Sequence, residues 1–412
     1  MKPINFFKFA TISIFGQGIG ILVPFIVGYF FIPSEFASFS LGLMISSFFL
    51  SFLINPTQTP YVIQAIEERG RTEKINETFT VQCIAFAISI IIAAFLFLIF
   101  GSKIALFSNI ANQQVFALFL AYLGLAIKSN VASYFLSLEH KNMSALVELL
   151  FNVTSILCII IAFLTGHLSL LFIFFTYFMS GLSVIILFIL KVEYRLITPL
   201  SFKKSAALQL FNFSKWQIFG LTAAFLVNWG DNIVLRQYSN LHDIGIYNFA
   251  YQIFKGTVTA SFIIYSYFLT FITKNIKNKE IIQTYLKKTR PILLFLSIGI
   301  LGFLFLLIYL LTEKIYGIEY LGVIPLTGIL LIATCLAVYS VFYIAIFNAL
   351  KKYAVVQIIL IVQISINLFL DIVFVPRFGI YGAAMATVIG YGFALIMYEY
   401  YFQKKISKNL LS

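Results

Sequence analysis

The chain has 412 residues, of which 61% are hydrophobic and 10% are charged, and its formal net charge is +13. Soluble domains carry roughly 25% charged residues, so this composition is too poor in charge to cover a water-soluble protein of this size. The excess of basic residues does not indicate nucleic-acid binding, because these residues gather in short loops between apolar segments. That distribution is typical of a protein embedded in a lipid bilayer.

Twelve apolar segments follow one another along the chain, and each is long enough to cross a bilayer as a helix. Segments such as 84–100 are apolar on every face, whereas the strands of a membrane barrel alternate apolar and polar residues. The sequence therefore predicts an all-α polytopic membrane protein. The expected spans are 9–31, 36–58, 78–100, 114–138, 143–165, 168–190, 209–235, 246–272, 291–311, 321–347, 355–375 and 380–402.

The lysines and arginines predict the orientation of these spans. With the N-terminus in the cytoplasm, 21 of the 28 basic residues fall in cytoplasmic segments, four fall in outer segments, and three fall inside spans. Cytoplasmic loops of membrane proteins carry an excess of Lys and Arg. We therefore expect both termini on the cytoplasmic side.

The two halves of the chain share short patterns at a nearly constant offset. Residues 35–40 match residues 243–248 in their order of acidic, apolar, small and aromatic positions, and Lys141 recurs as Lys352. Chance alignment of apolar helices is the alternative. A duplication predicts an N-terminal six-helix bundle (1–190), a cytoplasmic linker (191–208) and a C-terminal six-helix bundle (209–412). Duplicated bundles are typical of transporters that open alternately to the two sides of the membrane.

Span 8 carries a polar stripe on an otherwise apolar helix. At 100° per residue its polar side chains fall within about 60° of one another. A charged side chain inside the bilayer is costly and faces the protein interior or a water-filled cavity. Lys255, near the middle of the stripe, either offers a positive charge to an anionic substrate or pairs with a carboxylate. The stripe consists of Asn248, Gln252, Lys255, Thr259, Ser266 and Thr270.

Several acidic residues also lie inside spans. Asp231 in span 7 is a candidate proton or cation site, or the counter-ion of Lys255 or Arg236. Glu148 in span 5 lies at nearly the height of Lys128 in span 4, so the two form a structural ion pair or contact a substrate. Span 11 places Gln363, Asn367 and Asp371 on one face, with Asp371 close to the outer end and in reach of the interface.

Two segments carry a resemblance to a known family. Residues 229–236 (Trp-Gly-Asp-Asn-Ile-Val-Leu-Arg), with the following 243–250 (Asp-Ile-Gly-Ile-Tyr-Asn-Phe-Ala), are similar to the span 7–8 signature of the polysaccharide transporter family. Residues 367–387, which contain Pro376-Arg-Phe-Gly379-Ile-Tyr-Gly382-Ala-Ala-Met-Ala386-Thr387, resemble its span 11–12 signature. This family belongs to the multidrug/oligosaccharidyl-lipid/polysaccharide (MOP) exporter superfamily.

The resemblance implies an O-antigen (Wzx-like) flippase of the bacterial inner membrane, which serves lipopolysaccharide biosynthesis. Such a protein moves an undecaprenyl-diphosphate-linked oligosaccharide from the cytoplasmic to the periplasmic leaflet and is a transporter, not an enzyme. Its partners would be the lipid-linked oligosaccharide, the bilayer and other polysaccharide-assembly membrane proteins, with no nucleic acid. No cofactor is expected beyond coupling to a proton or sodium gradient, and the cysteines and histidines show no metal-site spacing.

Candidate site residues follow from their positions on the helices, not from a fixed family motif. The substrate-binding candidates, which would form a cationic cavity, are Lys255, Lys128, Arg236, Asn248, Gln252 and Thr259. The ion-coupling candidates are Asp231, Asp371 and Glu148. No catalytic or metal-binding residue is expected.

Other functions remain open. A drug/cation antiporter of the same superfamily should have an anionic cavity, whereas here more basic than acidic groups lie deep in the spans. Members of the lipid II flippase group usually carry fourteen spans, whereas this sequence predicts twelve. A membrane-embedded O-antigen polymerase or glycosyltransferase should show a large outer loop, and a non-transporting scaffold is the last alternative.

Overall fold

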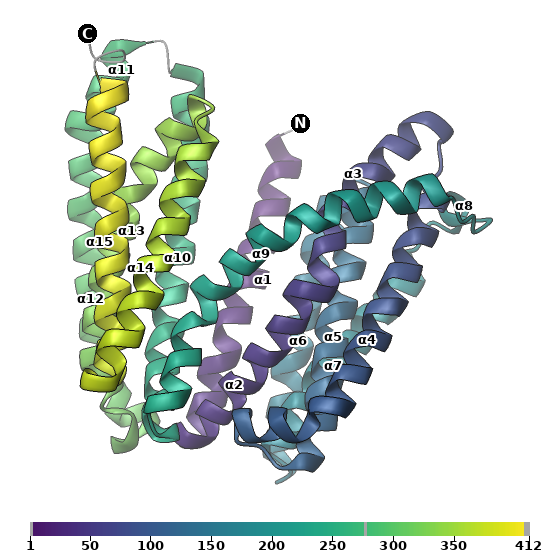
Figure 1. Ribbon diagram of the computed structural model, residues 1–412, viewed down its shortest axis with the longest axis horizontal. Helices are drawn as coiled ribbons and strands as arrows, with labels where there is room; N and C mark the ends of the chain where they lie inside the picture. Colours follow the sequence, from purple (N-terminus) through teal and green to yellow (C-terminus); the bar gives the residue numbers. More distant parts are fainter. Residues whose placement is uncertain (1–2, 276–277, 408–412) are drawn as a thin grey trace. The chain divides into compact units, whose positions relative to one another are not determined.

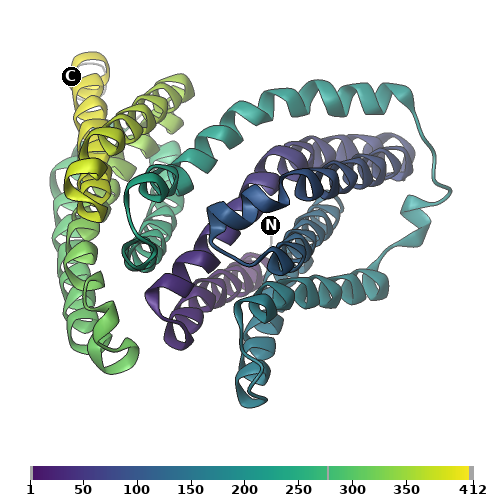
Figure 2. The ribbon, with the colours of Figure 1, turned by 60° about the horizontal axis from the view of Figure 1, so that its bottom comes forward.

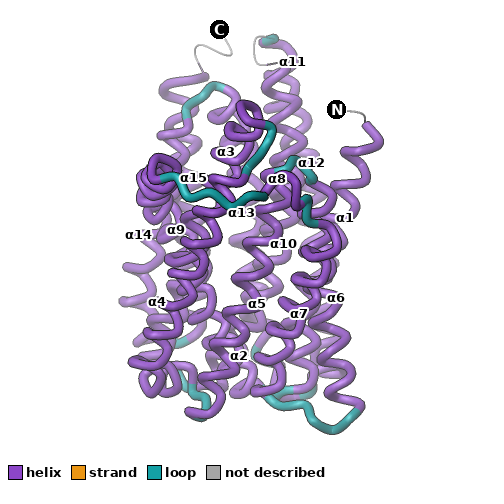
Figure 3. Tube along the Cα trace, turned by 90° about the vertical axis from the view of Figure 1, so that its right-hand side faces the viewer, coloured by secondary structure: helices purple, strands orange, loops and turns teal. Residues whose placement is uncertain are grey.

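A computed structural model describes residues 3–275 and 278–407. Within these ranges the chain consists of helices joined by loops and contains no strand (Figure 1, Figure 3). The first half contains α1 (Pro3–Phe30), α2 (Pro33–Phe49), η1 (Leu50–Ile54), α3 (Asn55–Thr72), α4 (Asn76–Ser108), α5 (Asn112–Ser137), α6 (Lys141–Leu164), α7 (Leu170–Lys191) and α8 (Tyr194–Ile197). The second half contains α9 (Lys204–Tyr238), α10 (Leu241–Asn275), α11 (Lys279–Thr284), η2 (Tyr285–Thr289), α12 (Arg290–Tyr316), η3 (Ile318–Tyr320), α13 (Val323–Ala349), α14 (Tyr353–Phe378), α15 (Ile380–Phe402) and η4 (Gln403–Ser407).

Each expected span coincides with a long helix, which confirms the all-α fold. Among the described residues, ten helices are long and apolar enough to cross a membrane. The first and eighth expected spans correspond to α1, with 28 residues, and α10, with 35. The second span is longer than expected, because α2, η1 and α3 form one continuous rod from Pro33 to Thr72. A helix of this length exceeds the hydrocarbon core of about 30 Å, so one end extends beyond it.

The chain forms two compact units. Unit 1 consists of Met1–Val27 and Ser38–Phe225, and unit 2 consists of Gly28–Ala37 and Leu226–Ser412. The change from unit 1 to unit 2 falls inside α9, so the first half of this helix groups with the N-terminal bundle. The division expected from sequence lies earlier, at the loop that precedes α9.

Helix packing follows the same scheme in both units. In unit 1, α5 packs against α3, α4, α6 and α7, and α6 packs against α7. In unit 2, α13 packs against α10, α12, α14 and α15, and α14 packs against α15. These are the spans that correspond under an offset of six, so the packing supports an internal duplication.

The segment between α7 and α9 is fixed to unit 1 rather than extended freely. Ile75 donates its backbone N–H to Leu196 O at 2.9 Å, and the Lys74 amino group donates to Thr198 O at 3.0 Å. Lys203 forms an ion pair with Glu77 at 3.1 Å. Together these three contacts hold the segment against the loop between α3 and α4.

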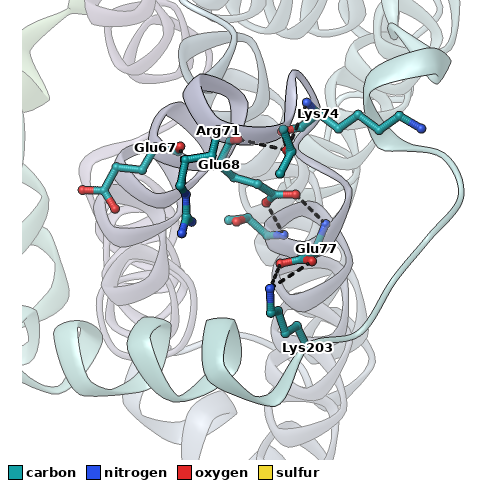
Figure 4. A network of polar contacts seen from close by, with 8 residues as sticks. Glu67, Glu68, Arg71, Lys74, Glu77 and Lys203 are labelled. Carbon is teal, nitrogen blue, oxygen red and sulfur yellow. Dashed lines mark hydrogen bonds and ion pairs between the residues drawn. The ribbon is translucent and has the colours of Figure 1, made fainter.

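Glu68 organises the same end of unit 1 (Figure 4). Its buried carboxylate accepts the backbone N–H groups of Glu77 at 2.9 Å and Thr78 at 2.8 Å. These are orphan donors in the first turn of α4, and a carboxylate at a helix N-terminus is favoured by the helix dipole as well. Glu67, the preceding residue, points away from this network.

Candidate functional site

Two aspartates lie side by side in the interior of unit 2. Asp231 comes from α9 and is 4% exposed, and Asp371 comes from α14 and is fully buried. Their carboxyl groups are within hydrogen-bonding reach of each other. The position near the end of span 11 had indicated an interfacial Asp371, but protein encloses this side chain completely.

Neutral hydrogen-bonding groups surround Asp231. The Tyr247 hydroxyl of α10 donates to Asp231 Oδ2, and the Thr387 hydroxyl of α15 lies 3.4 Å from the same oxygen. With its amide nitrogen toward Asp231, Asn367 donates to Oδ1 at 3.1 Å and accepts the Thr387 backbone N–H at 3.2 Å. Apart from the contact with Asp231, both carboxyl oxygens of Asp371 lack a hydrogen-bond partner in the part of the chain that the structure describes.

No basic side chain among the described residues forms an ion pair with either aspartate, and Lys255 interacts with Asp231 only at longer range. Two carboxylates that share a buried site cannot both remain ionised unless a counter-charge enters. A proton or a cation at this site would remove the repulsion, and intramembrane carboxylates of transporters commonly bind one.

A small cavity adjoins the pair. Its volume is about 20 Å³, which is enough for about one water molecule or one ion without its hydration shell. Carboxylate, amide and hydroxyl oxygens are the ligands that hard cations prefer. The cavity is lined by Val227, Asp231, Tyr251, Gln363, Ile364, Asn367, Thr387, Gly390 and Tyr391.

The Asn367 amide can serve either occupancy. Turned the other way, it presents its carbonyl oxygen to the Asp231 carboxylate, which places two acceptors face to face. This arrangement is repulsive while Asp231 is ionised and the site is empty. It becomes favourable when a cation lies between the two oxygens, or when a protonated Asp231 donates its O–H to the Asn367 carbonyl oxygen. The Asn367 amide can therefore adapt its orientation to the charge of the neighbouring carboxylate.

Glycines bring the helices around the pair close together. A Cβ on Gly230 of α9 would lie 2.6 Å from a Leu368 side-chain carbon on α14. A Cβ on Gly382 of α15 would lie 2.6 Å from the Phe374 carbonyl carbon. Small residues at such positions allow helices to approach closely in membranes.

Lys255 lies on α10, close enough to Asp231 to interact electrostatically. Its amino group is 4.3 Å from the Trp229 ring centroid and 5.1 Å from that of Tyr251. Aromatic faces attract an ammonium group that is removed from water. Lys255 is therefore in contact with aromatic rings, and it forms no ion pair with a carboxylate among the described residues.

The remaining residues of the span 8 stripe differ in their surroundings. Asn248 is buried and donates to Asn232 Oδ1 at 2.8 Å, a structural contact. Gln252 is half-buried and Thr259 is exposed. The side chains of Ser266 and Thr270 lie outside the described residues.

Lys128 and Glu148 lie in unit 1 and form an ion pair of 3.0 Å between α5 and α6. Asn152, one turn after Glu148, donates to the same carboxylate at 3.3 Å and to Gly16 O of α1 at 2.9 Å. The Lys128 amino group also lies 4.9 Å from the Phe151 ring centroid. The two charged groups are therefore close to each other, as predicted. Their ion pair and the link to α1 through Asn152 fit a structural role, one of the two roles that the sequence left open.

Arg236 lies in the last turn of α9 and is half-buried. Tyr247 and Thr387 were not singled out from the sequence, although both lie in the segments that carry the family resemblance. Their hydroxyl groups become significant only when α10 and α15 are placed around Asp231. Spacing within a single helix could not have indicated this.

Comparisons with known proteins agree with this architecture. A family model described as "Polysaccharide biosynthesis protein" matches residues 4–272. No curated protein matches the chain.

Solved structures share the fold at low sequence identity. A lipid II flippase, MurJ, in an inward closed conformation superposes with a TM-score of 0.76 at 15% identity, covering 98% of this chain and 89% of that one. A multidrug resistance MATE transporter of the MOP superfamily, in an inward-facing conformation, gives 0.73 at 15% identity with 98% of both chains covered. The MATE transporter VcmN of Vibrio cholerae gives 0.62 at 14% identity, covering 98% and 97%.

Proposed function

Because the chain belongs to the polysaccharide biosynthesis protein family, we propose that it is a flippase for an undecaprenyl-diphosphate-linked oligosaccharide. The cargo would be an O-antigen unit or a related polysaccharide repeat, moved from the cytoplasmic to the periplasmic leaflet of a bacterial inner membrane. The family match carries this proposal. The shared fold with a lipid II flippase and with MATE transporters supports a transport role.

Physical chemistry explains why such a cargo needs a protein. The diphosphate and the sugar hydroxyls lose their hydration in hydrocarbon, and each polar group left without a partner there costs several kcal/mol. The undecaprenyl chain is apolar and can stay in the bilayer. The protein therefore has to solvate the head group alone.

Lysines inside the spans are the proposed contacts for the diphosphate. Lys255 of unit 2 lies against the Trp229 and Tyr251 rings and forms no ion pair with a described carboxylate, although it interacts with Asp231 at longer range. Lys128 of unit 1 is paired with Glu148, and a diphosphate would have to compete with that carboxylate. We expect Lys255 to contribute more to binding, with Arg236 in a supporting role.

The Asp231–Asp371 pair is the proposed coupling site. Binding of a proton or a sodium ion would remove the repulsion between the two carboxylates and stabilise the packing of α9 against α14 and α15. Release would restore the repulsion and favour a different arrangement. A ligand shifts a conformational equilibrium only by its difference in affinity for the two states. A site whose net charge changes on occupancy supplies such a difference.

A drug/cation antiporter is the second candidate. The buried acidic pair and the likeness to MATE transporters favour it. An antiporter of this kind should confer resistance to lipophilic cations when overexpressed, and its deletion should leave surface polysaccharide unchanged.

Deletion with complementation tests the proposal. The deletion strain should lose surface polysaccharide and accumulate the lipid-linked unit in the cytoplasmic leaflet, and the wild-type gene should restore both. Full-length surface polysaccharide in the deletion strain would rule out the flippase function.

A further inference from the structure

Unit 1 contains a second hollow, which lies apart from the candidate site of unit 2. A groove of about 490 Å³ separates α3 from the first half of α9, and Figure 2 shows these two helices running alongside each other. Its volume is within the range of small-molecule sites, about 300–1,000 Å³. It is lined by Pro60, Ile63, Gln64, Glu67, Gln209, Asn212, Phe213 and Trp216.

Both walls of the groove are continuous helix faces. The lining residues of α3 span positions 60, 63, 64 and 67, and those of α9 span positions 209, 212, 213 and 216. Each set follows the i, i+3, i+4, i+7 spacing of one helix face. The two helix faces therefore lie opposite each other across the groove, and their side chains leave the space between them open.

The lining combines planar hydrogen-bonding groups with aromatic rings. The carbonyl oxygen of Gln64 is buried without a hydrogen-bond partner in the described part of the chain. Glu67 points away from the neighbouring ionic network, and no described residue pairs with its carboxylate. Asn212 Oδ1 accepts the Lys215 amino group at 3.2 Å, which fixes the orientation of that amide.

These groups match the chemistry of a sugar. A pyranose ring presents a C–H face that packs on an aromatic ring, and hydroxyl pairs at its edge that bind amides and carboxylates. A buried polar atom without a partner is costly, and a ligand hydroxyl would satisfy Gln64. Phe213 and Trp216 provide the rings, and the Trp216 indole N–H adds a donor.

Other ligands fit less well. A diphosphate would meet Glu67 as the only charged side chain of the lining, and like charges repel. An isoprenoid chain would displace water from the three amides and the carboxylate of the groove and would form no hydrogen bonds in its place. A lipophilic cation could use Glu67 and the rings, but it would leave the amides unsatisfied.

We propose that the groove between α3 and α9 is a carbohydrate-binding subsite for the sugar portion of the lipid-linked substrate. This inference rests on the proposed function and adds the position at which the sugar is recognised. The groove lies at the end of unit 1 that the charge distribution predicts to be cytoplasmic, which is the side where the sugar would enter.

The two tryptophans of the chain, Trp216 and Trp229, make a direct test possible. In the full-length variant W229F, reconstituted in nanodiscs, Trp216 is the sole indole and reports on the groove. The probe is the oligosaccharide released by mild acid from the lipid-linked pool of the deletion strain. We expect a saturable change in Trp216 emission, and no such change with undecaprenyl diphosphate that carries no sugar.

Variants then separate binding from folding. In the W229F background, Gln64→Leu should weaken oligosaccharide binding by about tenfold, as expected for a lost hydrogen bond that leaves ligand hydroxyls unpaired. Phe211→Ala is the matched control, because Phe211 is an exposed ring on the same helix but outside the groove. Its affinity should stay within about twofold of the parent.

Three results would overturn the subsite. One is an absent Trp216 response when the intact lipid-linked pool binds. Another is an equal response to sugar-free undecaprenyl diphosphate. The third is a response to tetraphenylphosphonium that Glu67→Gln abolishes, with none to the oligosaccharide. Each can occur while complementation still shows polysaccharide export, so failure of the subsite is distinguishable from failure of the flippase proposal.

Discussion

The carboxyl group of Asp371 on α14 faces that of Asp231 on α9 in the interior of unit 2, and neither is paired with a basic side chain in the described part of the chain. In the described residues, the side chains that hydrogen-bond to Asp231 besides Asp371 are the Tyr247 and Thr387 hydroxyls and the Asn367 amide. Protonation or the binding of a small cation would relieve the repulsion between two such carboxylates.

The first prediction concerns this pair. Asp371→Asn removes one of the two negative charges, so cation binding should no longer stabilise the protein. A ligand at ten times its Kd stabilises the native state by about 1.4 kcal/mol. Wild-type protein in detergent should therefore melt at a temperature about 2 °C higher in saturating sodium or at lower pH, and the variant should not. A sodium or proton response in Asp371→Asn equal to that of the wild type would contradict the coupling role.

The second prediction concerns Lys255. Lys255→Ala should abolish export, whereas Lys255→Arg should retain part of it, because the guanidinium keeps the charge and can still lie against the Trp229 and Tyr251 rings. Surface polysaccharide in a complemented deletion strain measures the effect. Lys103→Ala is the control, since Lys103 is an exposed cation at the end of α4. Normal export by Lys255→Ala at wild-type protein level would remove Lys255 from the site.

The third prediction separates the two roles of the Lys128–Glu148 pair. Lys128→Met leaves Glu148 without its partner and should lower protein abundance, since a partly buried carboxylate loses its counter-charge. Combining Lys128→Met with Glu148→Gln should restore abundance. Export should stay low in the double variant if Lys128 also contacts the diphosphate, and full export there would show that the pair is structural only.

The fourth prediction concerns helix packing in unit 1. A Cβ on Gly124 of α5 would overlap the Tyr177 carbonyl oxygen of α7, and Gly181 of α7 packs directly on Gly124. Gly124→Ala should therefore force α5 and α7 apart and cost about 1–3 kcal/mol, as overpacking does. Thermal melting in detergent measures this. Gly299→Ala on α12 has open space around the new methyl group, so an equal loss in both variants would contradict the packing account.

Much of the fold was predictable from the sequence, because a bilayer permits few alternatives to helices. The expected spans coincide with the long helices, since about 20 apolar residues in a row can be satisfied only as a transmembrane helix. The extension of span 2 through Thr72 was not predicted. Residues 59–72 contain four charged side chains, so the sequence predicts a loop there: these are Glu67, Glu68, Arg69 and Arg71. In the structure this segment is helical, and Glu68 accepts a backbone N–H from the first turn of α4.

The candidate site was predictable only in part. Asp231 and Asn248 were identified because polar residues are rare inside spans. The contact between Asp231 and Asp371 could not be derived, because it depends on how α9, α14 and α15 pack, and no periodicity within one helix encodes this. The groove between α3 and α9 could not be derived for the same reason, since its lining combines the faces of two helices that lie far apart in the sequence.

Translocation in a purified system tests the central proposal most directly. Full-length protein in proteoliposomes would be supplied with the undecaprenyl-diphosphate-linked oligosaccharide extracted from the deletion strain, and a sugar-modifying enzyme outside the vesicles would report the fraction that reaches the outer leaflet. The flippase account predicts that this fraction rises with time beyond that of empty vesicles, that an imposed sodium or proton gradient changes the rate, and that Asp371→Asn removes the gradient dependence. Equal access in empty and protein-containing vesicles, under either gradient, would contradict it.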